Sequence, residues 1–313
     1  MPRGEKVHRT QGQLLVSIAL FATATACQPA SPPSSVPEPT PALSAAPPAS
    51  TGVAEPNASA PLSPVETTPP DPRPPALESP DPFVFLEVAD HGDAVVSLPL
   101  GARDKRPIVL ATHGNYDTPE WQCQVWRDIV ADDAFVLCPR GVARGDSPSR
   151  MDLRYEYVSN KHLEKEIDAA VDALRAQYPD HVDDGPLLFT GFSQGAIMGA
   201  SIMVRRPDRY PLAVLIEGGN RAWYAANAKS FAEGGGKRIL FACGQWVCNQ
   251  RSATAIRGLS KQGVEAQVVF SKGQGHTYGG AVATDIASLF DWVVEDDPRW
   301  EHRRARKAEE AGR

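Results

Sequence analysis

The alternation of apolar and polar segments from residue 83 onward predicts a sheet flanked by helices. Short runs rich in β-branched and aromatic residues alternate with longer segments whose apolar positions recur every three or four residues. The first two runs are joined by a turn at residues 91–93, which is typical of a strand pair. The expected strands cover residues 83–88, 94–100, 107–112, 134–138, 187–190, 212–216, 238–242 and 265–270.

Helical segments separate the expected strands from the third strand onward. Residues 161–178 carry a clear apolar stripe that includes Leu163, Ile167 and Leu174, and Pro179 ends it. This alternation predicts right-handed crossovers. We therefore expect an α/β fold with an eight-stranded, mostly parallel, doubly wound sheet and helices on both faces. The expected helices cover residues 120–131, 161–178, 196–205, 222–232, 252–262 and 281–294.

Composition divides the chain into a folded part and a spacer. Residues 28–82 hold 18 of the 29 prolines and no Phe, Tyr or Trp. Such a segment buries too little apolar surface to offset the entropy of ordering, so we expect a Pro-rich disordered linker. The folded domain should then span residues 83–298. Residues 299–313 carry charges of both signs without an apolar period, and we expect a solvated, charged tail.

The first 27 residues have the pattern of an export signal. Arg3, Lys6 and Arg9 precede an apolar run, residues 14–26, that is too short to cross a bilayer comfortably. Small residues then lead into Cys27, which resembles a bacterial lipoprotein signal whose cysteine becomes lipidated. Ala24 stands where such signals usually carry Leu, so cleavage without lipid stays open. We expect an exported protein, lipid-anchored in a bacterial cell envelope or alternatively secreted in soluble form.

The charge of the chain and its cysteines indicate which binding partners, disulfides and metals to expect. The net charge of −6 comes with no basic stripe, so nucleic acid is not an expected partner, and membrane contact is expected only through the lipid. If Cys27 carries the lipid, four cysteines remain, and an even number in an exported protein predicts two disulfides. Four cysteines can be paired in three ways. We favour Cys123 with Cys138 and Cys243 with Cys248. The cysteine spacing shows no zinc pattern, and we expect no metal.

The strongest chemical signal is a serine flanked by glycines. Residues 191–195 read Gly-Phe-Ser-Gln-Gly between an expected strand and an expected helix, which is the context of a nucleophile elbow. The sharp turn requires small neighbours and leaves the Ser193 hydroxyl exposed at the positive end of a helix. His276 follows the last expected strand, where a fold of this kind places its catalytic base. We expect His276 to activate Ser193.

A second loop offers hydrogen-bond donors. His113-Gly114-Asn115-Tyr116 follows the third expected strand. The backbone N–H of Asn115 or of Tyr116, together with that of Gln194, would form an oxyanion hole for acyl transfer. The sequence does not decide between Asn115 and Tyr116.

Residues 107–295 resemble the dienelactone hydrolase and phospholipase/carboxylesterase-like branch of the α/β-hydrolases. The resemblance rests on four segments, PIVLATHGNYDTP, CPRG, LLFTGFSQGAIMGA and GQGHTYGG. It implies a serine hydrolase that cleaves carboxylic esters or related acyl bonds of a small-molecule or polymeric substrate, without a metal or organic cofactor.

Enzymes of this branch use a catalytic triad of serine, histidine and an acidic residue, and the acidic residue is missing from its usual position in this sequence. The acid normally follows the seventh strand, but residues 244–251 contain no Asp or Glu. In one explanation Glu217, after the sixth strand, supplies the carboxylate, and in a second Asn249 orients His276 by hydrogen bonding. In the third the triad is degenerate and the protein is a non-catalytic cell-surface binder. We favour Glu217. A serine peptidase of the same fold is the rival among enzymes, because the same triad cleaves amides.

Overall fold

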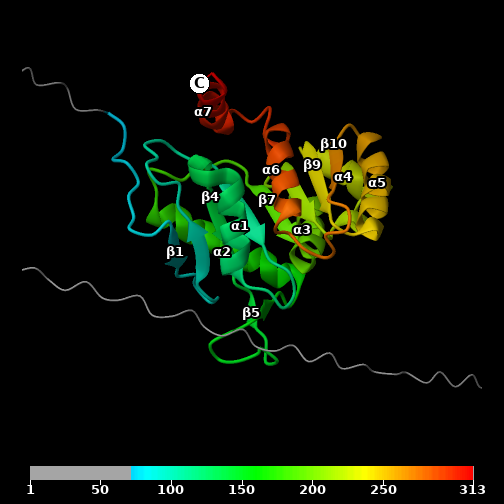
Figure 1. Ribbon diagram of the computed structural model, residues 1–313, viewed down its shortest axis with the longest axis horizontal. Helices are drawn as coiled ribbons and strands as arrows, with labels where there is room; N and C mark the ends of the chain where they lie inside the picture. The colour runs from blue at the N-terminus through cyan, green and yellow to red at the C-terminus, as the bar shows by residue number, and fades with distance from the viewer. Residues whose placement is uncertain (1–71, 313) are drawn as a thin grey trace, which may run out of the picture. The chain divides into compact units, whose positions relative to one another are not determined.

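An eight-stranded sheet runs through the part of the chain that the computed structural model describes, residues 72–312 (Figure 1). The strand order is β1-β2-β4-β3-β7-β8-β9-β10. β2 is antiparallel to both of its neighbours, and all other neighbouring strands are parallel. The predicted α/β fold with a mostly parallel, doubly wound sheet is confirmed. The strands are β1 (Phe83–Leu86), β2 (Ala94–Ser97), β3 (Ile108–Thr112), β4 (Phe135–Cys138), β7 (Leu188–Phe192), β8 (Leu212–Ile216), β9 (Arg238–Cys243) and β10 (Glu265–Phe270).

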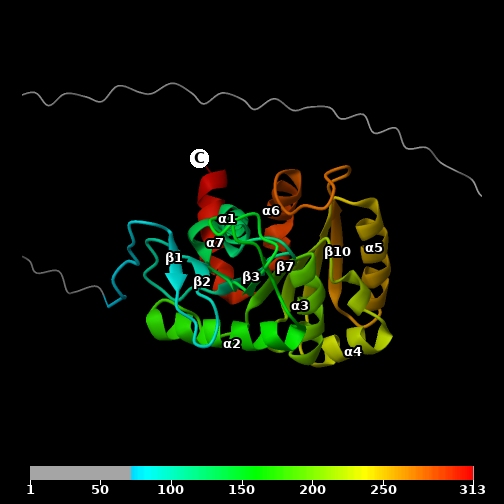
Figure 2. The ribbon, with the colours of Figure 1, turned by 90° about the horizontal axis from the view of Figure 1, so that it is seen from below.

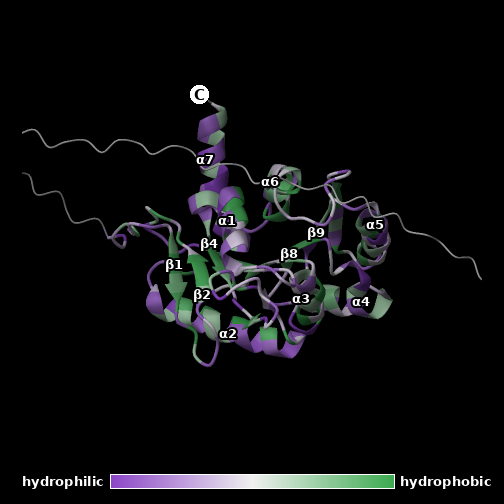
Figure 3. Ribbon diagram, turned by 60° about the horizontal axis from the view of Figure 1, so that its bottom comes forward, coloured by the Kyte–Doolittle hydropathy of each residue, from purple (hydrophilic) through white to green (hydrophobic). Residues whose placement is uncertain are grey.

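Helices cover both faces of the sheet and enclose two hydrophobic clusters (Figure 2). Buried side chains of α1 and α6 belong to one cluster, and those of α2, α3, α4 and α5 belong to the other. Hydrophobic strands lie between helices whose outer sides are hydrophilic (Figure 3). No helix within residues 72–312 is both long and apolar enough to span a bilayer. The helices are α1 (Pro119–Val130), α2 (Asn160–Gln177), α3 (Gln194–Arg205), α4 (Ala225–Glu233), α5 (Trp246–Ser260) and α6 (Ala281–Val293).

Local sequence accounts for these elements. Every residue of β3, β4 and β8 is buried, as expected for apolar runs covered by helices on both sides. α1 begins after Thr118, whose hydroxyl accepts a hydrogen bond from the Trp121 N–H at 3.3 Å, with Pro119 in the first turn. The Ser159 hydroxyl caps α2 in the same way, accepting from the His162 N–H at 3.2 Å.

The N-terminal predictions fall mostly outside the described residues. These are the signal at residues 1–27, the lipidation of Cys27 and the linker as far as residue 71. The end of the expected linker packs on the domain, because Leu77 is buried and its N–H donates to the Ala102 carbonyl at 2.9 Å. His181 Nε2 also lies 3.0 Å from the Pro75 carbonyl oxygen. The folded part therefore begins near residue 75 rather than at residue 83.

Other elements also differ from the prediction, most of all α5 and the connection between β4 and α2. α5 begins at Trp246, six residues before the expected start. The first turn of this helix lacks regularly spaced apolar residues facing the core, so the hydrophobic pattern placed the start too late. The connection between β4 and α2 contains a small antiparallel pair, β5 (Val142–Ala143) and β6 (Tyr155–Glu156), which is too short to leave a periodic pattern.

The expected solvated tail is wrong, because the C-terminal residues are anchored. They form a 3-10 turn, η3 (Pro298–Trp300), and a helix, α7 (Glu301–Ala311). Trp300 is fully buried with its ring centroid 5.2 Å from that of Phe290. Arg303 Nη1 contacts Asp133 Oδ2 at 2.7 Å, and both side chains are buried. Asp133 lies 170 residues before Arg303, so the charge pattern of the tail alone could not reveal this ion pair.

Replacing Trp300 with alanine should lower the free energy of unfolding by about 3–5 kcal/mol, because it opens a cavity beside Phe290. Urea unfolding followed by tryptophan fluorescence and circular dichroism measures the change. Trp246→Ala is the matched control, since the Trp246 side chain is largely exposed and its loss should cost less than about 0.5 kcal/mol. Equal, small losses in both variants would show that the C-terminal segment is not part of the core.

Candidate active site

Loops from the carboxyl ends of parallel strands converge at one edge of the sheet. Ser193 directly follows β7, Glu217 directly follows β8, and His276 lies in the loop after β10. The loop containing Asn115 follows β3, which is hydrogen-bonded to β7. Because the strands are parallel and adjacent, residues from distant parts of the sequence meet at this edge, where open α/β sheets bind their ligands.

The turn at Ser193 has a strained backbone. Its φ is 48° and its ψ is −108°, a region that non-glycine residues seldom adopt. A Cβ atom on Gly191 or on Gly195 would lie 2.6 Å from Thr112 Oγ1, so both positions require glycine. The turn places Ser193 at the N-terminal end of α3, where the helix dipole favours developing negative charge.

Ser193, His276 and Glu217 form a connected chain of polar contacts. Ser193 Oγ lies 2.9 Å from His276 Nε2, and His276 Nδ1 lies 3.4 Å from Glu217 Oε2. The Glu217 side chain is only 1% exposed, whereas that of His276 is 45% exposed. A buried carboxylate behind a half-exposed imidazole is the arrangement that a serine nucleophile requires.

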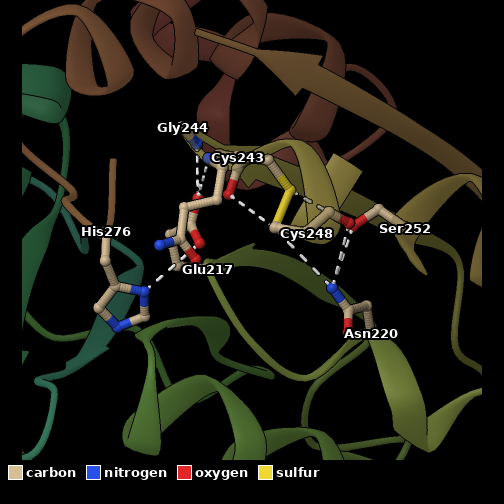
Figure 4. The surroundings of a disulfide bond; sticks show 9 residues. Glu217, Asn220, Cys243, Gly244, Cys248, Ser252 and His276 are labelled. Carbon is tan, nitrogen blue, oxygen red and sulfur yellow. Dashed lines mark hydrogen bonds and ion pairs between the residues drawn. A yellow bond between two sulfur atoms is a disulfide. The ribbon is translucent and has the colours of Figure 1, made fainter. Parts of the chain in front are cut away.

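Two backbone donors hold the Glu217 carboxylate in place (Figure 4). Its Oε1 accepts hydrogen bonds from the N–H groups of Gly244 at 2.5 Å and Gln245 at 2.8 Å. The Glu217 N–H donates to the Ala242 carbonyl at 3.0 Å, which continues the β8–β9 pairing by one residue. Because Oε1 is occupied in this way, Oε2 is the oxygen that faces His276.

Asn249 takes no part in the series of contacts that joins Ser193, His276 and Glu217. It is in the second turn of α5, and no hydrogen bond joins it to His276 within residues 72–312. Of the two explanations that keep a third member, the geometry therefore favours the relocated carboxylate.

A disulfide closes the loop that holds Glu217. Cys243 and Cys248 are bonded, with Cα atoms 5.6 Å apart, and the two residues that donate to Glu217 lie between them (Figure 4). The second disulfide joins Cys123 on α1 to Cys138 at the end of β4, with Cα atoms 5.9 Å apart. These are the two pairings that the sequence analysis favoured.

The structure distinguishes between the two oxyanion-hole donors. The Tyr116 N–H donates to the Tyr155 carbonyl at 3.0 Å, so the expectation that it could serve in the oxyanion hole is corrected. No hydrogen bond of the described residues uses the Asn115 N–H, and Gln194 is the first residue of α3, whose N–H has no acceptor within the helix. Of the three expected donors, Asn115 and Gln194 therefore keep N–H groups without an acceptor among the described residues.

An open cleft borders the Ser193–His276 pair. Its walls are largely aromatic, and the exposed Trp121 ring has the Arg154 guanidinium 4.2 Å from its centroid. The half-exposed imidazole of His276 is part of the lining of this cleft. The lining residues are Asn115, Tyr116, Asp117, Trp121, Val125, Phe192, His276, Thr277, Tyr278 and Gly279.

Asp117 is a site residue that the sequence analysis missed. It is buried, its Oδ2 accepts from the Gly114 N–H at 3.3 Å, and its Oδ1 accepts from the Tyr278 hydroxyl at 3.1 Å. Burial and the nearby Asp117 charge raise the pKa of Tyr278 far above its usual value, so this hydroxyl stays protonated and donates. Asp117 thus connects the Asn115 loop to the His276 loop. No local pattern marks an aspartate in a loop for this role.

Two groups of side chains have the donor atoms of a metal site among the described residues. The first is Glu217 with Cys243 and Cys248, whose sulfur atoms are consumed in the disulfide and cannot act as thiolate ligands. The second comprises His91, His162 and Glu166, which are not among the residues that line the cleft.

The fold and the site together define a protein with the α/β-hydrolase fold. No protein-family model and no curated protein sequence matches the chain. An S-formylglutathione hydrolase from Agrobacterium tumefaciens is similar in structure, with a TM-score of 0.50 and 16% identity over 68% of this chain and 93% of that one. Esterase PE8 has a TM-score of 0.49 and 20% identity over 67% of this chain and 100% of that one. For the Bacillus cereus carboxylesterase the TM-score is 0.45, with 18% identity over 64% and 93%.

Proposed function

We propose that this protein is a serine ester hydrolase that works through an acyl-enzyme intermediate. The observation that carries the proposal is the chain of contacts from Ser193 Oγ to His276 Nε2 at 2.9 Å and from His276 Nδ1 to Glu217 Oε2 at 3.4 Å. The structural similarity to an S-formylglutathione hydrolase supports the same class of reaction, cleavage of an acyl bond.

In the proposed mechanism, the residues of the site carry out acyl transfer in two stages. Ser193 Oγ attacks the ester carbonyl carbon while His276 Nε2 takes the hydroxyl proton. The N–H groups of Asn115 and Gln194 stabilise the oxyanion of the tetrahedral intermediate, and Glu217 stabilises the imidazolium. The imidazolium then protonates the leaving alcohol as the carbon–oxygen bond breaks. Water, deprotonated by His276, attacks the acyl-enzyme and releases the carboxylic acid and free Ser193.

The substrate is a small-molecule or polymeric ester, and the protein acts outside the cytoplasm. The half-exposed His276 and the aromatic cleft support a site that accepts a substrate from the surface. Two disulfides in the described part support export. We propose a lipid anchor at Cys27 in a bacterial cell envelope, with a soluble secreted form as the alternative.

A fluorophosphonate probe tests the proposed function. We expect stoichiometric labelling of Ser193, located by peptide mass spectrometry, and hydrolysis of short p-nitrophenyl esters that the probe abolishes. Peptide p-nitroanilides, tested in parallel, should be cleaved far more slowly. Faster cleavage of the amides would identify a peptidase instead, and absence of labelling would favour a non-catalytic binder.

A further inference from the structure

A histidine from the β1–β2 turn lies against the first turns of α2. His91 and His162 have ring centroids 5.2 Å apart, and Glu166 follows His162 by four residues. Residues spaced by four lie on the same face of a helix, so His162 and Glu166 both face this point. The ligand atoms of the three side chains lie within 4.8 Å of one another.

Two polar atoms of this cluster are buried without a hydrogen-bond partner in the described structure. They are His162 Nδ1 and Glu166 Oε2. Glu166 is 1% exposed, and its other oxygen, Oε1, accepts from the Gly141 N–H at 2.8 Å. Buried polar atoms are nearly always satisfied in folded proteins, so a carboxylate oxygen and an imidazole nitrogen that are both unpaired in one cluster indicate a missing partner. A cation satisfies both at once, because each atom has a lone pair to donate.

We propose that His91, His162 and Glu166 bind a first-row divalent transition metal ion, with Zn²⁺ as the ion to test. Two imidazole nitrogens and one carboxylate suit zinc, whereas calcium and magnesium prefer oxygen ligands alone. Ligands bound to zinc at about 2.0–2.1 Å lie about 3.3 Å apart in a tetrahedron, so the cluster contracts on binding. His91 makes this adjustment because it is partly exposed and lies in a turn, which also gives the ion a path from solvent. Water completes the coordination.

The surrounding charges permit a cation at this position. Glu166 brings a negative charge that compensates part of the charge of the ion. The guanidinium of Arg140, which packs near the same turn, is ion-paired with Glu120 at 2.9 Å and donates to the Asp93 carbonyl at 2.6 Å. Its charge is therefore already balanced by a carboxylate of its own.

The ion ties together segments that support the active-site loop. It connects the β1–β2 turn to α2, and Glu166 extends the connection to Gly141. Next to Gly141, the Arg140 carbonyl oxygen lies 2.8 Å from Nε2 of the buried His113, which begins the Asn115 loop. The metal therefore has a structural role and takes no part in acyl transfer.

Zinc binding to the full chain, stripped with a chelator and dialysed, tests this site without any activity measurement. Competition with a chromophoric chelator should show one Zn²⁺ per chain, and saturating zinc should raise the melting temperature by about 2 °C or more. His91→Ala and His162→Ala should each weaken binding by about tenfold or more and remove the thermal shift. His181→Ala, a partly exposed histidine outside the cluster, is the matched control and should bind like the wild type.

Each outcome decides the proposal. Absence of zinc binding in the wild-type chain, or equal binding by His91→Ala, would overturn it. Loss of binding in His181→Ala to the same extent would show adventitious binding by surface histidines. If His162→Ala does not fold, His91→Ala alone decides, because His91 lies in an exposed turn. Glu166→Gln keeps an acceptor for the Gly141 N–H and removes the charge, so its weaker binding distinguishes ligation from packing.

Discussion

Ser193→Ala should lower kcat/KM for p-nitrophenyl esters by at least about 10⁴-fold, because no acyl-enzyme can form without the Oγ nucleophile. The loss should appear in kcat, and the fold should be retained, since alanine differs from serine only by the hydroxyl. Initial-rate kinetics with circular dichroism and thermal melting of the same samples measure both quantities.

Ser260→Ala is the matched control for this substitution. Ser260 is an exposed serine at the end of α5, and its replacement should leave turnover within about twofold of the wild type. Substantial esterase activity in Ser193→Ala would show that another residue is the nucleophile and would refute the proposed mechanism.

Glu217→Gln should lower kcat by about 10⁴-fold, by reversing the tautomer of His276. The N–H groups of Gly244 and Gln245 will hold the amide oxygen of the new side chain where Oε1 now lies. The amide NH₂ then faces His276 Nδ1, which must accept, and the ring proton moves to Nε2. A protonated Nε2 cannot take the proton from Ser193.

Asn249→Ala tests the competing explanation for the third member. Asn249 makes no hydrogen bond to His276 in the described structure, so the variant should keep turnover within about twofold. Steady-state kinetics on both variants, with thermal melting as the folding check, separate the alternatives. Near-wild-type turnover of Glu217→Gln would rule out the relocated carboxylate, and a large loss in Asn249→Ala would assign the role to the amide.

The strands illustrate what local pattern predicts well. The observed β3, Ile108–Thr112, lies within one residue of the expected strand at each end, and β8 and β10 coincide with the predicted residues. Apolar side chains buried on both faces mark β3 and β8, whereas β10 lies at the sheet edge and alternates exposed and less exposed residues at its start. The start of α5 was missed because its first turn carries Trp246 and Val247 on the surface, and exposed apolar residues break the expected spacing.

The active site shows which residues local sequence patterns can identify and which they cannot. The Gly-Phe-Ser-Gln-Gly motif occupies five consecutive residues, so its serine could be singled out from the sequence, although the contacts with Thr112 that exclude side chains at Gly191 and Gly195 come from β3. The acid could not be chosen in this way, because Glu217 and Asn249 both follow strands that end at the same sheet edge. Orientation decides between them, and it depends on the donors of Gly244 and Gln245, which become neighbours of Glu217 only when β8 pairs with β9.

The sequence by itself determined the order of the main strands and helices and the elbow motif at Ser193. These features depend on interactions over a few residues: side-chain period, turn geometry and apolar content. The tertiary structure alone decided which carboxylate faces His276, that Tyr116 is not free as an oxyanion donor, that the tail is anchored by Trp300, and that His91 meets His162 and Glu166. Each of these depends on contacts between segments far apart in the chain, and packing of the whole sheet and its helices determines their distances.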